Sequence, residues 1–264
     1  MTTLQTVFEK ARAENRSALV GYLPAGFPSK DGAVAAATAM VEAGCDVIEI
    51  GLPYSDPLMD GPTIQDAVHR SLTNGTRIGD VMRTVEGVAK SGAATLVMTY
   101  WNPVDRYGAE RFARELASAG GTGTITPDLT PEESEPWLAA SKEAGIDTVF
   151  LVAPSSPDAR ISRVVSCCTG FVYAASLMGV TGARESVGAA AEGVVKRTRS
   201  HTSLPVCVGL GVGNGRQAAE VAAYADGVIV GSAFIRRLLD APDEKTGLAA
   251  VRELADELAR GVRR

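Results

Sequence analysis

Short runs of β-branched residues alternate with longer, Ala-rich amphipathic stretches along the chain. This alternation is typical of repeated βα units, in which the strands form a parallel sheet and the helices cover it. The apolar runs predict eight strands, at residues 18–23, 47–52, 94–100, 124–126, 148–152, 170–175, 205–210 and 227–230.

The amphipathic stretches between these runs have the periodicity of helices. They predict helices at residues 31–43, 63–73, 79–90, 109–119, 131–144, 187–198, 215–223 and 247–260. An extra helix is expected at residues 4–15, before the first strand. Eight units that close on themselves form an α/β (βα)8 TIM barrel. We therefore expect residues 1–264 to form one barrel domain with the N-terminal helix across its bottom; an open doubly wound sheet is the alternative.

Composition changes this picture little and excludes some functions. The 264 residues are 45% hydrophobic, enough for a large core, and the net charge of -5 argues against a nucleic-acid surface. No apolar run reaches the roughly 18 residues of a membrane span. The N-terminal residues lack a basic segment followed by an apolar one, so no signal peptide is expected and the cytoplasm is the default location.

The residues that usually bind metals or form Schiff bases are poorly placed. The two histidines lie far apart, and the four cysteines lack the spacing of a zinc or redox site, so we expect no metal and read the cysteines as buried apolar residues. The lysines fall outside the predicted strand ends, which argues against a Schiff base. These residues are Cys45, Cys167, Cys168, Cys207, His69, His201, Lys10, Lys30, Lys90, Lys142, Lys196 and Lys245. Acid/base chemistry is therefore left to carboxylates and tyrosines.

Position along the strands divides the acidic residues. In such barrels the chemistry lies where strands end and βα loops begin, whereas the opposite face serves stability. Three aspartates at strand beginnings are therefore read as turn or cap residues, and five acidic residues late in or after strands are candidates for chemistry. The first group is Asp46, Asp147 and Asp226; the second is Glu49, Asp56, Asp60, Asp105 and Asp128.

Glu49 is the most informative candidate. Strand alternation puts Ile48 and Ile50 on one face and Val47, Glu49 and Gly51 on the other. If the isoleucines face the helices, Glu49 points into the barrel. An unpaired carboxylate there should have a raised pKa, toward the range useful to a general acid or base. The alternative is a buried glutamate satisfied by a neighbouring hydroxyl group.

The connection that follows, residues 51–62, is long and rich in proline and acidic side chains. Long loops in compact barrels are usually functional. Alternatively, this is a rigid surface loop in which Asp56 and Asp60 only cap turns. Tyr22, Met98, Tyr100 and Tyr173 lie late in their strands, where core packing is the more common role.

Two glycine clusters follow the last two predicted strands, at residues 209–213 and 230–233, the second just before a helix. Glycines let backbone N–H groups approach a phosphate, and a helix N-terminus adds a favourable dipole. In barrels these two loops are the usual phosphate site, although plain turns are the alternative. A third loop, residues 176–184, has glycines at 179 and 182 that would permit the hinge motion of a lid; a fixed turn is its alternative.

Several segments together resemble the tryptophan synthase alpha subunit family over essentially the whole chain. The most specific is residues 48–65, IEIGLPYSDPLMDGPTIQ; YWNPV at 100–104, PDL at 127–129, MGVTG at 178–182 and Gly231-Ser232 support it. Departures are Leu177, where many members have arginine, and the polar Thr122, Thr124 and Thr126 in the fourth strand.

The resemblance implies a lyase that cleaves indole-3-glycerol phosphate into indole and glyceraldehyde 3-phosphate. It implies that Glu49 is the catalytic acid/base and that Asp60 hydrogen-bonds the indole nitrogen. The other implied site residues are Tyr22, Met98, Ile125, Tyr173 and Leu210 around the indole, and Gly182, Gly211, Gly231 and Ser232 around the phosphate.

The resemblance also implies a partner. No cofactor is expected in this chain; pyridoxal phosphate is expected in a beta subunit, in an α2β2 complex whose interface includes Pro53 and Asp56. The alternatives are a stand-alone indole-releasing lyase, which shares every active-site residue, another phosphate-binding barrel such as an isomerase or a lysine-dependent synthase, and an idle barrel that only activates its partner.

Overall fold

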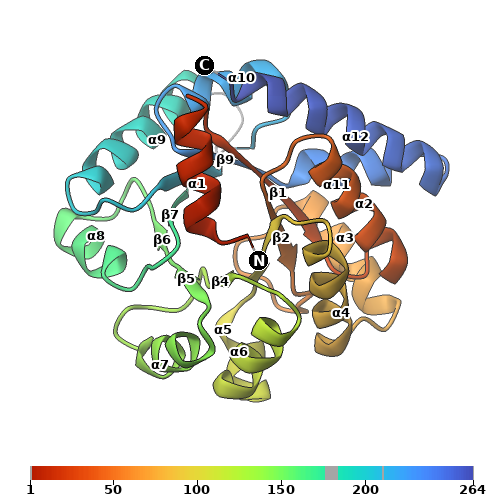
Figure 1. Ribbon diagram of the computed structural model, residues 1–264, viewed down its shortest axis with the longest axis horizontal. Coiled ribbons are helices and arrows are strands. Elements are labelled where there is room, and N and C mark those ends of the chain that lie inside the picture. The colour runs from red at the N-terminus through yellow and green to blue at the C-terminus, as the bar shows by residue number, and fades with distance from the viewer. Residues whose placement is uncertain (1, 176–183, 210, 264) are drawn as a thin grey trace.

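The computed structural model describes residues 2–175, 184–209 and 211–263, and places the strands inside a ring of helices (Figure 1). All strand pairs are parallel, in the order β5-β4-β3-β2-β1-β9-β8-β7-β6. The strands are β1 (Ala18–Pro24), β2 (Val47–Gly51), β3 (Ala94–Met98), β4 (Gly123–Ile125), β5 (Asp147–Val149), β6 (Leu151–Val152), β7 (Val172–Ala175), β8 (Val206–Gly209) and β9 (Gly227–Val230).

The two ends of this order, β5 and β6, are separated in the chain only by Phe150. β5 pairs with β4 and β6 pairs with β7, so the two short strands act as halves of one strand, the one predicted at 148–152. In the described part of the chain, eight strand positions therefore surround the interior, which confirms the TIM barrel and excludes the open sheet.

The helices follow the strands in the order expected for βα units. They are α1 (Leu4–Ala13), α2 (Lys30–Glu42), α3 (Pro62–Thr73), α4 (Ile78–Ala89), α5 (Trp101–Tyr107), α6 (Ala109–Ser118), α7 (Glu135–Ala144), α8 (Asp158–Val165), α9 (Arg184–Arg199), α10 (Gly215–Ala222), α11 (Ser232–Leu239) and α12 (Glu244–Gly261). The sequence pattern did not predict α5 and α8, because helices this short complete too few turns to show a clear period. It also placed Ser232 before a helix, whereas Ser232 begins α11.

Two apolar clusters hold the barrel together. One lies between the sheet and the surrounding helices and includes Ile48, Ile50 and Phe234. The other fills the barrel interior and includes Val20, Val47, Leu96, Ile125 and Ile229. The alternation of strand residues between these clusters is the one that the sequence predicted.

Helix α1 closes the bottom of the barrel, as expected, and crosses the centre of the ring in Figure 1. Its buried residues Leu4, Val7, Phe8 and Ala11 belong to the interior cluster. The ring of Phe8 meets that of Phe171 edge-on, with centroids 5.8 Å apart. The helix thus keeps water away from the interior at the end of the barrel opposite the βα loops.

Phe8→Ala should lower the free energy of unfolding by about 3 kcal/mol, because it leaves a cavity where α1 meets the interior cluster. Urea denaturation followed by circular dichroism measures this loss. The control is Gln5→Ala on the exposed face of the same helix, which should change stability little. Equal stability of Phe8→Ala and wild type would show that α1 does not close the barrel.

Candidate active site

Glu49 lies on the inner face of β2, near the carboxyl end of the barrel. Its Cα is paired with those of Tyr22 on β1 and Leu96 on β3. Only 1% of its surface is exposed, and within the described part of the chain Oε1 has no hydrogen-bond partner. Burial raises its pKa to about 8. The inward orientation and the raised pKa agree with the expectation from strand alternation.

Asp60 lies in the segment between β2 and α3 and is half-buried. Burial raises its pKa, and the hydrogen bond from Tyr100 opposes this shift. That bond joins Tyr100 Oη to Asp60 Oδ1 at 3.2 Å. The two carboxylates therefore have different environments: Glu49 is buried and favours its neutral form, whereas Asp60 has a donor that supports its charge.

The segment that carries Asp60 is fixed to the loop and helix after β3. Tyr100 Oη also accepts a hydrogen bond from the backbone N–H of Met59 at 2.9 Å. Asn102 Nδ2 donates to Tyr54 Oη at 2.8 Å, and the rings of Tyr54 and Tyr100 pack with centroids 5.6 Å apart. Asp128, in turn, accepts from the backbone N–H of Trp101, the first residue of α5.

Four of the five residues predicted around the indole lie at the same end of the barrel. Tyr22 is buried beside Glu49, Met98 ends β3 next to Ile125 at the end of β4, and Tyr173 lies on β7. Burial is the main cause that raises the pKa values of the Tyr22 and Tyr173 phenols, and the nearby charge of Glu49 raises both further. Leu210 lies outside the described residues.

The predicted phosphate residues follow β8 and β9. Gly231 is the N-cap of α11, and Ser232 begins this helix, whose N-terminus has no side-chain cap. Gly211 has a left-handed backbone, with φ of 64°. Adjacent β8 and β9 bring these turns to one edge of the barrel mouth. Gly182 and all of the predicted lid, residues 176–184, except Arg184 lie outside the described residues; Arg184 begins α9.

The aspartates assigned to the bottom face do have structural partners. Asp46 accepts two hydrogen bonds from Arg16 and one from the backbone N–H of Leu19. Asp226 accepts from the backbone N–H of Val206, and Asp147 from Thr169.

Of the two predicted partner-interface residues, Pro53 is buried and Asp56 is exposed. Leu58 and Met59 were not among the predicted interface residues, although their exposed fractions are 73% and 46%. Tyr100 was expected in core packing, and its bond to Asp60 was not predicted. The YWNPV motif was the available signal for Tyr100, but its contacts depend on a loop conformation that no local pattern specifies.

Within the described residues, no group of three His, Cys, Asp or Glu side chains is arranged to hold a metal ion. None of the helices among them is long and apolar enough to cross a membrane.

The pKa of Glu49 makes a prediction for stability. In the unfolded chain Glu49 ionises near 4.5, whereas in the folded protein it ionises near 8. Between these values the folded state holds the extra proton, so stability falls as pH rises from about 4.5 to 8. Glu49→Gln removes this dependence. We compare the free energy of unfolding of the variant with that of wild type. This difference should shift in favour of the variant by roughly 4 kcal/mol between pH 5 and pH 9, since one pKa unit corresponds to about 1.4 kcal/mol.

Urea denaturation of both proteins at the two pH values provides the test. Glu9→Gln on the exposed surface of α1 is the control for loss of a carboxyl group. A stability difference between Glu49→Gln and wild type that does not change with pH would contradict the buried, neutral glutamate.

Comparison with known proteins places this site in a family. The sequence profile described as tryptophan synthase alpha chain matches residues 8–263. The tryptophan synthase alpha chain of Thermobifida fusca is 59% identical, over 100% of this chain and 98% of the relative. That of Streptomyces avermitilis is 60% identical, over 98% and 94%.

Solved structures agree with the sequences. A tryptophan synthase structure from Mycobacterium tuberculosis superposes with a TM-score of 0.92 at 53% identity, covering 100% of both chains. Tryptophan synthase subunit alpha from Legionella pneumophila gives 0.90 at 30% identity, over 99% and 98%. With sequence and fold matching from end to end, the chain belongs to the tryptophan synthase alpha chain family.

Proposed function

We propose that Glu49 and Asp60 are the two carboxylates that cleave indole-3-glycerol phosphate in this chain. The family catalyses this cleavage in tryptophan biosynthesis, and the chain is a lyase of this kind. The observation that carries the assignment is the buried Glu49 carboxyl group, which has a pKa of about 8 at the catalytic end of the barrel.

Glu49 first acts as the acid. With a pKa of about 8 it is largely protonated at neutral pH, and it donates this proton to C3 of the indole ring. The ring then carries a positive charge shared by N1. The resulting Glu49 carboxylate takes the proton of the glycerol hydroxyl next to the ring. The C–C bond breaks as the aldehyde forms, and the bonding electrons return to the ring and neutralise it.

Asp60 stabilises the charged ring. As a carboxylate it accepts a hydrogen bond from the indole N1–H, and its negative charge lowers the energy of the cationic intermediate. Tyr100 donates to Asp60 Oδ1, which favours the ionised form and fixes the direction of the carboxylate. The two carboxyl groups thus take the complementary roles for which their environments suit them.

The phosphate group would bind at the N-terminus of α11, where Gly231 and Ser232 offer backbone N–H groups and the helix dipole attracts an anion. Gly211, and Gly182 by family resemblance, would complete the site. Anchoring the phosphate contributes binding energy that holds the reacting carbon near Glu49.

Both carboxyl groups should be required for activity. Glu49→Gln keeps the shape of the side chain but removes the titrating group, so kcat should fall by at least about 100-fold. Asp60→Asn should impair kcat severely while the substrate still binds. Indole release from indole-3-glycerol phosphate gives the rates, and Asp256→Asn, an exposed aspartate on α12, is the control. Near wild-type turnover by Glu49→Gln would refute the assignment.

Family membership implies a beta-subunit partner, and we propose an α2β2 complex in which that subunit carries pyridoxal phosphate and consumes the indole. The supporting feature is the exposed part of the segment between β2 and α3. Asp56 and Leu58 face solvent there, a few residues before Asp60. A partner bound at this surface would shift the segment that positions Asp60 and so couple binding to catalysis. We place this complex in the cytoplasm, with no cofactor in the alpha chain itself.

Adding a cognate beta subunit should increase indole release saturably. Asp56→Ala should raise the beta-subunit concentration needed for half-maximal activation by about tenfold, the effect of truncating a substantial interface contact. Glu253→Ala, an exposed carboxylate on α12, should leave that concentration unchanged. A cleavage rate that is indifferent to the beta subunit would contradict the coupling.

A further inference from the structure

Three neighbouring strands, β9, β1 and β2, carry the residues proposed to bind and cleave the substrate. β9 leads to Gly231 and Ser232, where the phosphate would bind, and β2 carries Glu49. β1 lies between them, paired with both. A substrate held by its phosphate above β9, with its reacting carbon at Glu49, must therefore pass its glycerol chain across the end of β1. The inward side chain at that position is Tyr22.

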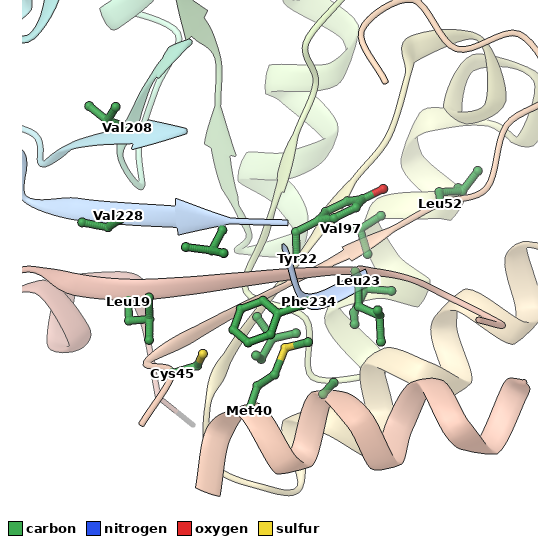
Figure 2. Close-up of a cluster of buried hydrophobic side chains, with 14 of the residues drawn as sticks. Leu19, Tyr22, Leu23, Met40, Cys45, Leu52, Val97, Val208, Val228 and Phe234 are labelled. Atoms are coloured by element: carbon green, nitrogen blue, oxygen red, sulfur yellow. The ribbon is translucent and has the colours of Figure 1, made fainter. Parts of the chain in front are cut away.

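The ring of Tyr22 spans the distance between the two subsites. Figure 2 shows it on the opposite side of β1 from Met40 and Phe234, with its oxygen toward Leu52, the residue after β2. At one end, a Cβ on Gly231 would lie only 3.1 Å from Tyr22 Cδ1. At the other end, a Cβ on Gly51 would overlap the Tyr22 hydroxyl group. Glycine at both positions is what allows the ring to lie there.

Gly51 leaves space in the barrel interior directly above Glu49. On β2 the inward positions are Val47, Glu49 and Gly51, so the residue directly above the catalytic carboxyl group has no side chain. The phenol of Tyr22 takes up this space instead. It therefore brings a polar group from β1 into the layer just above Glu49.

The hydroxyl group of Tyr22 is available to a ligand. None of the hydrogen bonds between described residues involves it, whereas Tyr100 Oη is bonded to both Asp60 and Met59. Burial and the nearby charges of Asp60 and Glu49 raise the pKa of Tyr22 well above its usual 10. The phenol thus keeps its proton at neutral pH and can donate it in a hydrogen bond.

We propose that Tyr22 Oη hydrogen-bonds the middle hydroxyl group of the substrate's glycerol chain, and so makes Tyr22 a specificity-determining residue. This hydroxyl lies between the phosphate-bearing carbon and the carbon whose hydroxyl Glu49 deprotonates, and it remains a hydroxyl in glyceraldehyde 3-phosphate. The role rests on the proposed function, because it presumes the phosphate above β9 and the reacting carbon at Glu49. It goes beyond a purely apolar contact with the indole.

Tyr22→Phe is the variant that tests this contact, because it removes the oxygen and keeps the ring between Gly51 and Gly231. The kcat/KM for indole-3-glycerol phosphate should fall by about tenfold, the upper part of the range for one neutral hydrogen bond. For a substrate that lacks only the middle hydroxyl, kcat/KM of wild type and Tyr22→Phe should be equal within about twofold. The Kd of indole-3-propanol phosphate, which has no glycerol hydroxyl, should likewise be unchanged.

The control variant is Tyr224→Phe, which removes a phenol hydroxyl from the segment between α10 and β9, outside the proposed site, and should leave kcat/KM unchanged. If Tyr22→Phe lowered kcat/KM equally for the natural and the deoxy substrate, or for neither, the proposed hydrogen bond would be refuted. Failure of wild type to cleave indole-3-glycerol phosphate would instead refute the proposed function, so the two failures are distinguishable.

Discussion

The desolvation of Glu49 is the constraint on which the rest of the site depends. No neighbouring charge accounts for its raised pKa; burial alone does. Burial of this kind requires that water be kept out from every side. The interior cluster and α1 exclude it from below, the strands on either side exclude it laterally, and the phenol of Tyr22 covers part of the layer above. If water entered past any of these parts of the structure, the pKa of Glu49 would return toward its usual value. Glu49 would then be ionised at neutral pH and could not donate a proton.

Asp60 needs the opposite protonation state from Glu49. Its proposed role requires the charged form; burial raises its pKa, and the hydrogen bond from Tyr100 opposes that shift. The loop needs fixed geometry but must also be able to respond to a partner. The Tyr54–Asn102 and Tyr100–Met59 bonds tie it to the residues after β3, and Leu58 between them stays exposed.

Much of the fold could be predicted from the sequence because alternation along each strand decides which side chains face inward. The orientation of Glu49 follows from this alternation, the helix across the bottom from an amphipathic stretch before the first strand, and the barrel from the number of βα units, which left the open sheet as an alternative. The contacts of Tyr100 could not be predicted, since they join loops 40 residues apart whose conformations no period specifies. The burial of Pro53 and the fit of Tyr22 over Gly51 also depend on three-dimensional proximity. The roles assigned to the site residues came from family resemblance, and they remain proposals.

The polar groups of the strands and their flanking residues are satisfied differently at the two ends of the barrel. At the bottom, Arg16 and Asp46 form two hydrogen bonds of 2.7 and 2.8 Å, and Asp46 also accepts from a backbone N–H. Of the four side-chain oxygens that are buried without partners in the described structure, Glu49 Oε1 and Thr126 Oγ1 lie at the top; the other two, Thr76 Oγ1 and Ser141 Oγ, lie after α3 and on α7. An unsatisfied buried group costs about 1–3 kcal/mol, so the catalytic end lowers stability. Because strands connect the ends rigidly, the satisfied bottom and the packed interior can offset that cost without touching the chemistry. Separating stability from catalysis in this way lets a buried carboxyl group without a hydrogen-bond partner on Oε1 persist in a folded protein.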